Sequence, residues 1–204
     1  GSALLLDGEA GIISRFTAAG QYAGIVAKDL VVYHPRGLAI AANGDMYVAD
    51  TGGSRVPRLS ANGQRLGTVG GRGNGRDGLD QPTGVATTNA GEVFVVDPAA
   101  QKVVRFSASG SVAAAWGFGT GPTVNGPQMA LGPDDTIWIS DTAGGSLQAF
   151  SVDGQPKGRY APAEGLNQPS GLAVGDGYVV VAEPGARRVE KLTTPDLTAS
   201  LAGG

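Results

Sequence analysis

The residue types that most enzymes use for chemistry are scarce in this chain of 204 residues. It contains no cysteine and a single histidine, His34, which excludes disulfides, thiolate nucleophiles and zinc sites built from cysteines or several histidines. His34 lies between Tyr33 and Pro35 with no nucleophile beside it, so we expect a surface or packing role rather than general-base catalysis. We therefore expect no catalytic residue, no bound metal and no cofactor.

Five acidic residues recur at intervals of 42 to 47 residues, each at the end of a stretch rich in β-branched and aromatic residues: Asp7, Asp50, Asp97, Asp141 and Glu183. A ring of carboxylates could chelate a hard cation. An acid followed by Gly, Thr or Pro, however, is typical of a turn in which the side chain accepts backbone N–H bonds. We interpret the five as turn residues. Basic residues that open the next stretch, Arg55, Lys102 and Arg188, are predicted to pair with acids of the neighbouring repeat.

Arginines are concentrated in one segment. Five of the eleven lie within 22 residues, from Arg55 to Arg76, and their planar forks suit carboxylates, phosphates and sugar hydroxyls. The same segment contains G-x-G-x-x-G over 73–78, which indicates a dinucleotide site only between a strand and a helix. Here it leads into a predicted strand that begins near Gly84, so we interpret it as a flexible connection.

A repeat organises the chain, in four full copies. Each copy begins with Pro, one variable residue and Gly or a near equivalent, at Pro35, Pro82, Pro127 and Pro169. A turn such as Asn43-Gly44 and the stretch that ends in the acid follow, and then two further alternating stretches. Each copy therefore predicts four short strands joined by hairpins. Four strands in ~44 residues is typical of a β-propeller blade.

The pattern P-x-G-[LV]-A, then a turn, then [VIM]-[YFW]-[VI]-[ASV]-D, resembles the NHL-repeat β-propeller family over nearly the whole chain. The resemblance implies an all-β propeller of four-stranded blades. We predict one domain over residues 1–204 with about five blades, four complete and one partial, which could be a sector of a six-bladed ring. The blades are expected at about 3–30, 34–71, 81–117, 126–160 and 168–201, with residues 1–2 as a cloning remnant.

The strand count leaves one blade incomplete. It gives 19 strands, because the chain begins at a second strand, Leu4 to Asp7, and ends with an expected fourth strand, Asp196 to Leu201. The missing strand is the inner one. An unpaired edge predicts self-association, or closure of the ring by another chain.

Propeller geometry nominates one face for binding. The loops that lead into inner strands and the loops that join second to third strands emerge on the same side, and a rigid scaffold often displays binding residues on such loops. Ser54 and Gly145 lie on these loops, but the predicted binding residues are the polar ones there together with part of the arginine segment: Arg36, Arg55, Arg72, Arg76, Thr83, Gln101, Gln128, Ser170 and Arg187.

The leading functional hypothesis is a non-catalytic recognition or sensor module for a protein or a glycan, because the resemblance implies such roles for NHL propellers. Two alternatives stay open. A lactonase-like hydrolase would need metal ligands in the central channel, whereas Asn43, Asn89 and Glu92 fall in hairpin turns; an amidating lyase would need several histidines. Binding of single-stranded RNA is disfavoured by the net charge of −3 and by 6% aromatic residues.

The location is expected to be outside the cytoplasm, with any targeting signal absent from this sequence. No apolar run approaches the ~18 residues that span a bilayer.

Overall fold

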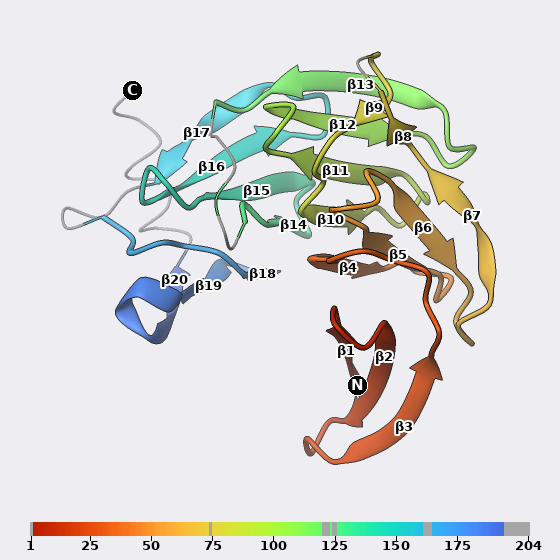
Figure 1. The fold of residues 1–204 in the computed structure, drawn as a ribbon. Helices are drawn as coiled ribbons and strands as arrows, with labels where there is room; N and C mark the ends of the chain where they lie inside the picture. Colours follow the sequence, from red (N-terminus) through yellow and green to blue (C-terminus); the bar gives the residue numbers. More distant parts are fainter. Residues whose placement is uncertain (1, 74, 120–122, 124–125, 161–164, 194–204) are drawn as a thin grey trace.

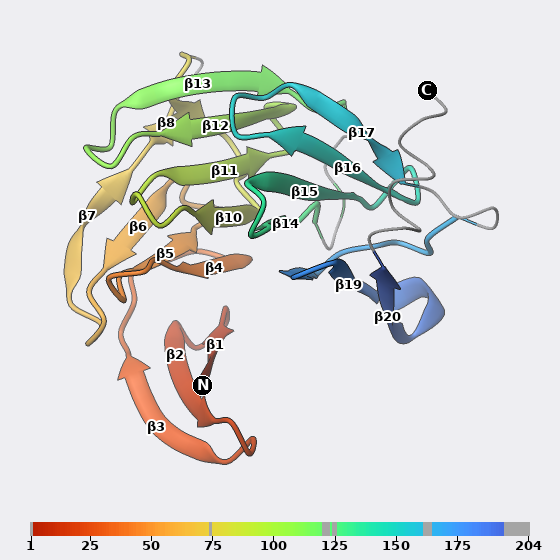
Figure 2. The ribbon, with the colours of Figure 1, turned by 180° about the vertical axis from the view of Figure 1, so that it is seen from behind.

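The structure is a computed structural model that describes residues 2–73, 75–119, 123, 126–160 and 165–193. Five antiparallel sheets follow one another in chain order around a common axis (Figures 1 and 2). This arrangement confirms the predicted all-β propeller of about five blades.

The five sheets have three, four, four, four and three strands. The first contains β1 (Ser2–Asp7), β2 (Ile12–Thr17) and β3 (Tyr22–Ala27). The second contains β4 (Gly37–Ile40), β5 (Met46–Ala49), β6 (Val56–Leu59) and β7 (Arg65–Val69). The third contains β10 (Gly84–Thr87), β11 (Val93–Asp97), β12 (Lys102–Phe106) and β13 (Val112–Gly117). The fourth contains β14 (Met129–Leu131), β15 (Thr136–Asp141), β16 (Ser146–Ser151) and β17 (Pro156–Tyr160). The fifth contains β18 (Leu172–Gly175), β19 (Tyr178–Glu183) and β20 (Arg188–Thr193), with the short 3-10 helix η1 (Pro184–Ala186) between the last two.

Among the described residues, the first sheet has no inner strand, as the sequence predicts, because β1 ends in Asp7 and therefore corresponds to the second strand of the other sheets. The expected last strand, Asp196 to Leu201, lies outside the described residues. A further short pair was not predicted. Within the connection expected to be flexible, β8 (Gly71–Arg72) and β9 (Gly78–Leu79) pair in parallel, and the connection leads into β10 rather than into a helix.

Four hydrophobic clusters join the five sheets, one at each successive interface. The cluster between the first two sheets contains Ile13 and Val48, and the next contains Tyr47 and Val95. The third contains Phe94 and Ile137. The fourth contains Trp138, Leu147, Val179 and Val181. Strand alternation sends neighbouring side chains to opposite faces, so each internal sheet contributes to two clusters. No cluster of described residues joins the first sheet to the fifth, and the ring formed by the described strands is open there (Figures 1 and 2).

The glycine of the P-x-G motif has a packing role at the inner strands. A Cβ on Gly84 would lie 2.9 Å from the backbone nitrogen of Met129 in the following sheet. The same atom on Gly171, in the last sheet, would meet nothing closer than 3.6 Å, the Cβ of Ala182. Glycine is therefore required at position 84, where another sheet packs closely, and is not required at position 171, at the open end.

Candidate binding site on the loop face

The two predicted sets of loops do lie together, and the repeated acids hold them. Asp97 is fully buried and accepts hydrogen bonds from the backbone nitrogens of Asp80 (2.6 Å), Gln81 (3.1 Å) and Ala100 (3.1 Å). The first two belong to the connection that leads into the sheet, and the third belongs to the turn after β11. Each acid thus fixes its own turn or the incoming connection, and in Asp97 it fixes both.

The other acids follow the same pattern. Asp50 accepts from the backbone nitrogen of Tyr33 (2.6 Å), and Glu183 accepts from that of Asn167 (2.7 Å). Asp7 and Asp141 accept from backbone nitrogens within their own turns. The turn interpretation is confirmed for Asp7, Asp97 and Asp141. Asp50 and Glu183 instead accept backbone N–H bonds from the incoming connection. Within the described residues, no group of three or more His, Asp or Glu side chains is placed to hold a metal ion.

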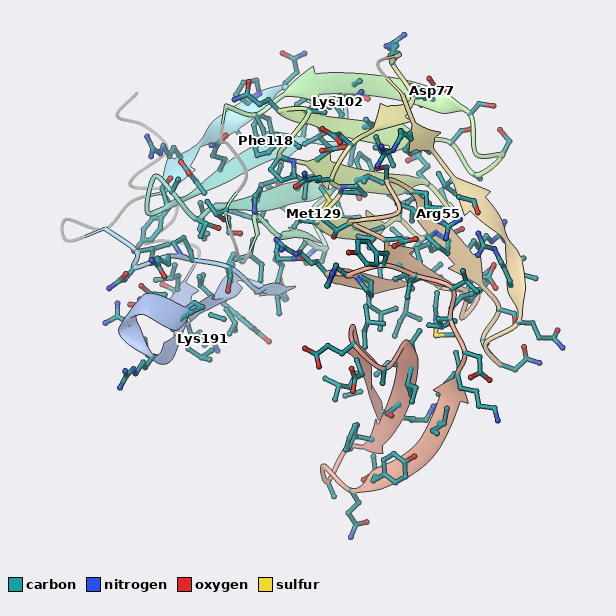
Figure 3. The ribbon with its side chains drawn as sticks, viewed as in Figure 1. Arg55, Asp77, Lys102, Phe118, Met129 and Lys191 are labelled. Carbon is teal, nitrogen blue, oxygen red and sulfur yellow. The ribbon has the colours of Figure 1, made fainter. Side chains whose placement is uncertain are left out.

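The expected ties between basic residues and acids of a neighbouring repeat were wrong. Arg55 pairs with Asp50 at 2.8 Å and Arg188 pairs with Glu183 at 2.7 Å, in each case across the hairpin of the same sheet. Lys102 donates to the carbonyl oxygen of Gly75, in the connection that leads into its own sheet (3.0 Å; Lys102 is labelled in Figure 3). A hairpin brings the residue that opens the third strand opposite the acid that closes the second. The basic residue therefore lies closer to the acid of its own sheet than to that of a neighbouring sheet.

Hydroxyl groups make the contacts between successive sheets on this face instead. Thr51 donates to the carbonyl oxygen of Pro82 (2.8 Å), and Thr142 donates to that of Pro169 (2.7 Å). Ser54 donates to the carbonyl oxygen of Asp80 (2.6 Å). These side chains are buried and hold the next connection in place.

One cavity on the loop face collects candidate binding residues. It has a volume of about 360 Å³ and lies where the connections into the second and third sheets meet, and its lining comprises His34, Arg36, Thr51, Gly52, Arg72, Asp80 and Gln81. Two arginines of the predicted set, Arg36 and Arg72, therefore come together although 36 residues separate them in sequence.

The two arginines differ in how they are held. Arg36 donates to the carbonyl oxygen of Thr123 (3.2 Å), and its own carbonyl oxygen accepts from the amide of Gln128 (3.1 Å). Both contacts cross to the loop that leads into the fourth sheet. Arg72 is exposed; its backbone belongs to the β8–β9 pair, and its side chain makes no hydrogen bond or ion pair with the described residues. Its guanidinium is thus available to a ligand, whereas Arg36 is anchored beside it.

An exposed aromatic group borders this cavity. The Tyr33 side chain is 64% exposed, and its ring packs edge-on against His34 with ring centres 4.3 Å apart. His34 has a left-handed backbone, with φ of 48°. His34 was expected to have a surface or packing role, and Tyr33, Asp80 and Gln81 were not among the predicted binding residues. The only feature of the sequence that could have pointed to Tyr33 is its position three residues before Arg36.

Several predicted site residues are placed elsewhere. Thr83 and Ser170 are buried, at 1% and 9% exposure, and Thr83 donates to the carbonyl oxygen of Pro127, so neither is displayed for binding. The Gln128 amide also donates to the carbonyl oxygen of Thr83 (2.8 Å) and has a structural role.

The remaining predicted residues are not lining residues of this cavity. Gln101 and Arg187 are exposed on turns with left-handed backbones, at φ of 50° and 54°. Arg76 is exposed between β8 and β9. Arg55 is committed to Asp50 and to the carbonyl oxygen of Val31 (2.8 Å).

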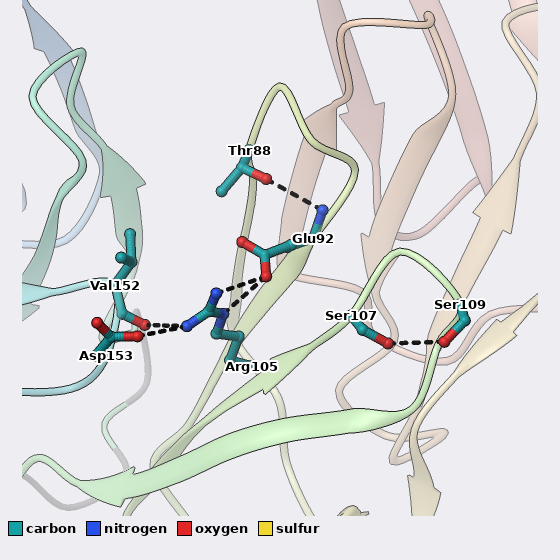
Figure 4. A network of polar contacts seen from close by, with 7 residues as sticks. All are labelled: Thr88, Glu92, Arg105, Ser107, Ser109, Val152 and Asp153. Carbon is teal, nitrogen blue, oxygen red and sulfur yellow. Dashed lines mark hydrogen bonds and ion pairs between the residues drawn. The ribbon is translucent and has the colours of Figure 1, made fainter.

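The opposite face has a larger hollow, of about 750 Å³, lined by the hairpin turns of the third, fourth and fifth sheets. Asn89 and Glu92, weighed as metal ligands, line it. Glu92 is already engaged: its Oε1 accepts from Arg105 at 2.7 and 3.0 Å (Figure 4). Asn43 donates to Asp45 in its own turn (3.1 Å).

Arg105 connects two sheets on that side. Besides Glu92, its guanidinium contacts Asp153 (2.7 Å) and the carbonyl oxygen of Val152 (3.2 Å) in the fourth sheet (Figure 4). The hydrogen bond to Glu92 raises the pKa of Arg105 above its usual value. The network joins the third sheet to the fourth. It occupies the Oε1 atom of Glu92, which accepts two hydrogen bonds from Arg105.

Comparison with known proteins supports the fold. No protein-family model and no curated protein matches this chain. Among solved structures it is similar to virginiamycin B lyase from Staphylococcus aureus, with 19% identity and a TM-score of 0.70, over 96% of this chain and 64% of the lyase. It is also similar to a streptogramin B lyase (14% identity, TM-score 0.67, 98% of this chain and 67% of that chain). A chain of a nidogen/laminin complex matches with 19% identity and a TM-score of 0.76, over 96% of this chain and 75% of that chain.

These similarities concern an enzyme in one case and a protein complex in another, so the fold is shared by proteins with different roles. The chain spans about two thirds of the length of the lyases that it matches. Within the described residues, no helix is long and apolar enough to cross a membrane. The structure and the comparisons together identify the chain as a β-propeller.

Proposed function

We propose that this chain is a recognition module that binds an acidic segment of a protein partner in the loop-face cavity. The observation that carries the proposal is the meeting of Arg36 and Arg72 at one cavity, with Arg72 free of partners among the described residues. A planar guanidinium can bind a carboxylate through two parallel N–H bonds.

The surroundings of the arginines suit a peptide better than a small ion. Tyr33 offers an exposed ring at the border of the cavity, and aromatic rings are enriched where proteins contact one another. The Gln81 side chain can bond to a main chain, and Asp80 repels a second negative charge at its own end of the cavity. One carboxylate flanked by neutral residues therefore fits better than a polyanion. A nidogen/laminin complex among the similar structures shows that this fold occurs in a protein assembly.

The test is a fluorescence anisotropy titration with a labelled peptide, Gly-Tyr-Glu-Gly-Tyr-Glu, at low salt. We expect the wild type to bind and the double variant Arg36→Gln with Arg72→Gln to lose about tenfold or more in affinity, because two charge-assisted bonds are removed. The control is Arg15→Gln with Arg65→Gln, two exposed arginines on β2 and β7. It changes the net charge equally and should bind like the wild type.

Either of two results would overturn the proposal: equal affinity in all three proteins, or equal loss in both double variants. Unchanged circular dichroism spectra show that the variants remain folded. Two companion titrations separate the other ligand classes. Binding of a neutral oligosaccharide that is insensitive to salt would favour a glycan, and binding of oligouridylate that weakens steeply with salt would favour RNA. A location outside the cytoplasm is part of the proposal and is tested separately by fractionating cells that express the full-length protein.

A further inference from the structure

The first sheet exposes a side chain that every other sheet buries. The residue two positions before the repeated acid points toward the preceding sheet, and it is completely buried in the four later sheets: Val48, Val95, Ile139 and Val181. The equivalent residue in the first sheet is Leu5, which is 57% exposed. Leu5 thus has the type and place of a packing residue, but no described sheet packs against it.

The last sheet shows the same feature on its other side. The residue six positions after the acid points toward the following sheet, and it is completely buried in the four earlier sheets: Ile13, Val56, Val103 and Leu147. The equivalent residue in the fifth sheet is Val189, which is 70% exposed. The two ends of the open ring therefore present the two halves of one interface.

Neighbouring side chains extend both faces. On the first sheet, Phe16 and Tyr22 lie across from each other with ring centres 5.8 Å apart, on the face that carries Leu5. On the fifth sheet, Ala173 pairs with Val180 at the positions where the third sheet has Ala86 and Phe94. Lys191, labelled in Figure 3, crosses this face with its ammonium nitrogen 4.0 Å from the centre of the Tyr178 ring.

We infer that these two faces are docking surfaces for at least one further four-stranded unit of the same repeat, which would close the ring. Continuity with the four internal interfaces supports this occupant, because the same positions with the same residue types already pack sheet on sheet. The similar solved propellers also extend beyond the matched part, since the chain covers 64% of one and 75% of another. A unit of the same repeat matches both faces at once, whereas a second copy of the whole open ring would have to match them through a different geometry. The inference is independent of the proposed function.

The first experiment uses the chain as it is. Light scattering coupled to size exclusion should give a monomer, and the dye 1-anilinonaphthalene-8-sulfonate should fluoresce on binding the exposed faces. Val189→Asp should leave the melting temperature unchanged, because Val189 is exposed. A dimer that dissociates in Leu5→Asp or Val189→Asp would overturn the inference, because a second copy would then be the occupant.

The second experiment extends the chain with a copy of its own residues 81–125 placed after Gly204. We expect dye fluorescence to fall, the amides of the added strands to become protected from hydrogen exchange, and Val189→Asp now to lower the melting temperature. Leu66→Asp is the matched control, because Leu66 is also exposed (53%) but lies on β7, away from the open faces. It should be neutral in both proteins. An unprotected extension, or a Val189→Asp effect no larger than before, would contradict the inference.

Discussion

At the scale of single residues, the repeated acid makes the hydrogen bonds that fix the turns and connections of the loop face. Asp97 is fully buried and has three backbone N–H partners without a basic partner in the described structure. Glu183 has one such partner and a guanidinium. Asp97 therefore connects its strand end, its turn and the incoming connection, and its bonds to Asp80 and Gln81 position two residues that line the candidate site.

Replacing Asp97 with alanine should lower the free energy of unfolding by about 3 kcal/mol, because buried N–H groups lose a charged acceptor. Urea unfolding followed by circular dichroism measures the change. Asp77 is exposed in the connection before β9 and is the control (labelled in Figure 3); Asp77→Ala should have little effect. Equal effects of the two variants would refute the role assigned to Asp97.

Glu183 should make stability depend on pH. Burial alone would raise the pKa of Glu183, but the bonds from the Asn167 nitrogen and from Arg188 outweigh it and leave that pKa below its usual value. The folded state then binds fewer protons than the unfolded state, so the contribution is complete above the ordinary carboxyl pKa of about 4.3 and is lost as pH falls through the lower folded value.

The melting temperature of Glu183→Gln should therefore differ most from the wild type near neutral pH and converge with it in acid. Glu190→Gln is the comparison with opposite sign. Burial and the neighbouring Glu183 raise the pKa of Glu190, so the folded state favours the protonated form of the Glu190 carboxyl. A constant gap between Glu183→Gln and the wild type from pH 7 to pH 2.5 would contradict the assignment.

At the scale of elements, the inner strands show how the sheets pack around the axis. Gly84 in β10 faces the backbone of β14, whereas Gly171 precedes β18 at the open end. The two residues occupy the same place in the repeat. They differ in whether another sheet follows and in the cross-strand neighbour, which is Val96 for Gly84 and Ala182 for Gly171. They form a natural pair for testing the packing.

Gly84→Ala should destabilise the protein by about 1–3 kcal/mol through overpacking, because its new Cβ would lie 2.9 Å from the Met129 nitrogen. Gly171→Ala should change stability by no more than about 0.5 kcal/mol, since its nearest neighbour would be 3.6 Å away. Chemical denaturation of both variants provides the measurement. A large cost at Gly171 would mean that a further sheet occupies the open end in solution.

At the scale of the whole molecule, the repeat made most of the fold predictable. The alternation of side chains around each acid gave the strands, and the acids' turn role followed from their neighbours in sequence. The burial of Thr83 and Ser170 could not be foreseen from the sequence. Thr83 is covered by the connection into the next sheet, where it donates to the carbonyl oxygen of Pro127, whereas Ser170 donates to the carbonyl oxygen of Ala182 within its own sheet.

The composition of the site depended on the same relative placement of sheets. Arg36 and Arg72 line one cavity because the connections into two successive sheets converge. The pairing of β8 with β9 fixes the backbone position of Arg72. Neither the convergence nor the β8–β9 pair has a signal in local periodicity. Local ion pairs such as Arg55 with Asp50 follow from hairpin geometry, which places the two residues opposite each other in one sheet. The prediction of a partner in a neighbouring sheet was therefore wrong.

A metal-dependent activity would stabilise the whole ring on ligand binding. The proposed binding role predicts that calcium leaves the melting temperature unchanged. Weak calcium sites have dissociation constants down to about 10⁻⁴ M. At about 100 times that concentration, a bound calcium ion would raise the free energy of unfolding by about 2.7 kcal/mol. Thermal unfolding with and without calcium measures this. A clear rise would favour the lactonase-like alternative over the proposed binding role.

The most direct test of the binding site is a two-dimensional ¹H–¹⁵N spectrum of the labelled protein titrated with the peptide Gly-Tyr-Glu-Gly-Tyr-Glu. The account predicts that amide shifts change at Arg36, Gly52, Arg72 and Gln81, the lining of the loop-face cavity. The turns that line the opposite hollow, such as Asn89 and Asp176, should stay unchanged. Shifts confined to that opposite hollow, or none at millimolar peptide, would contradict it.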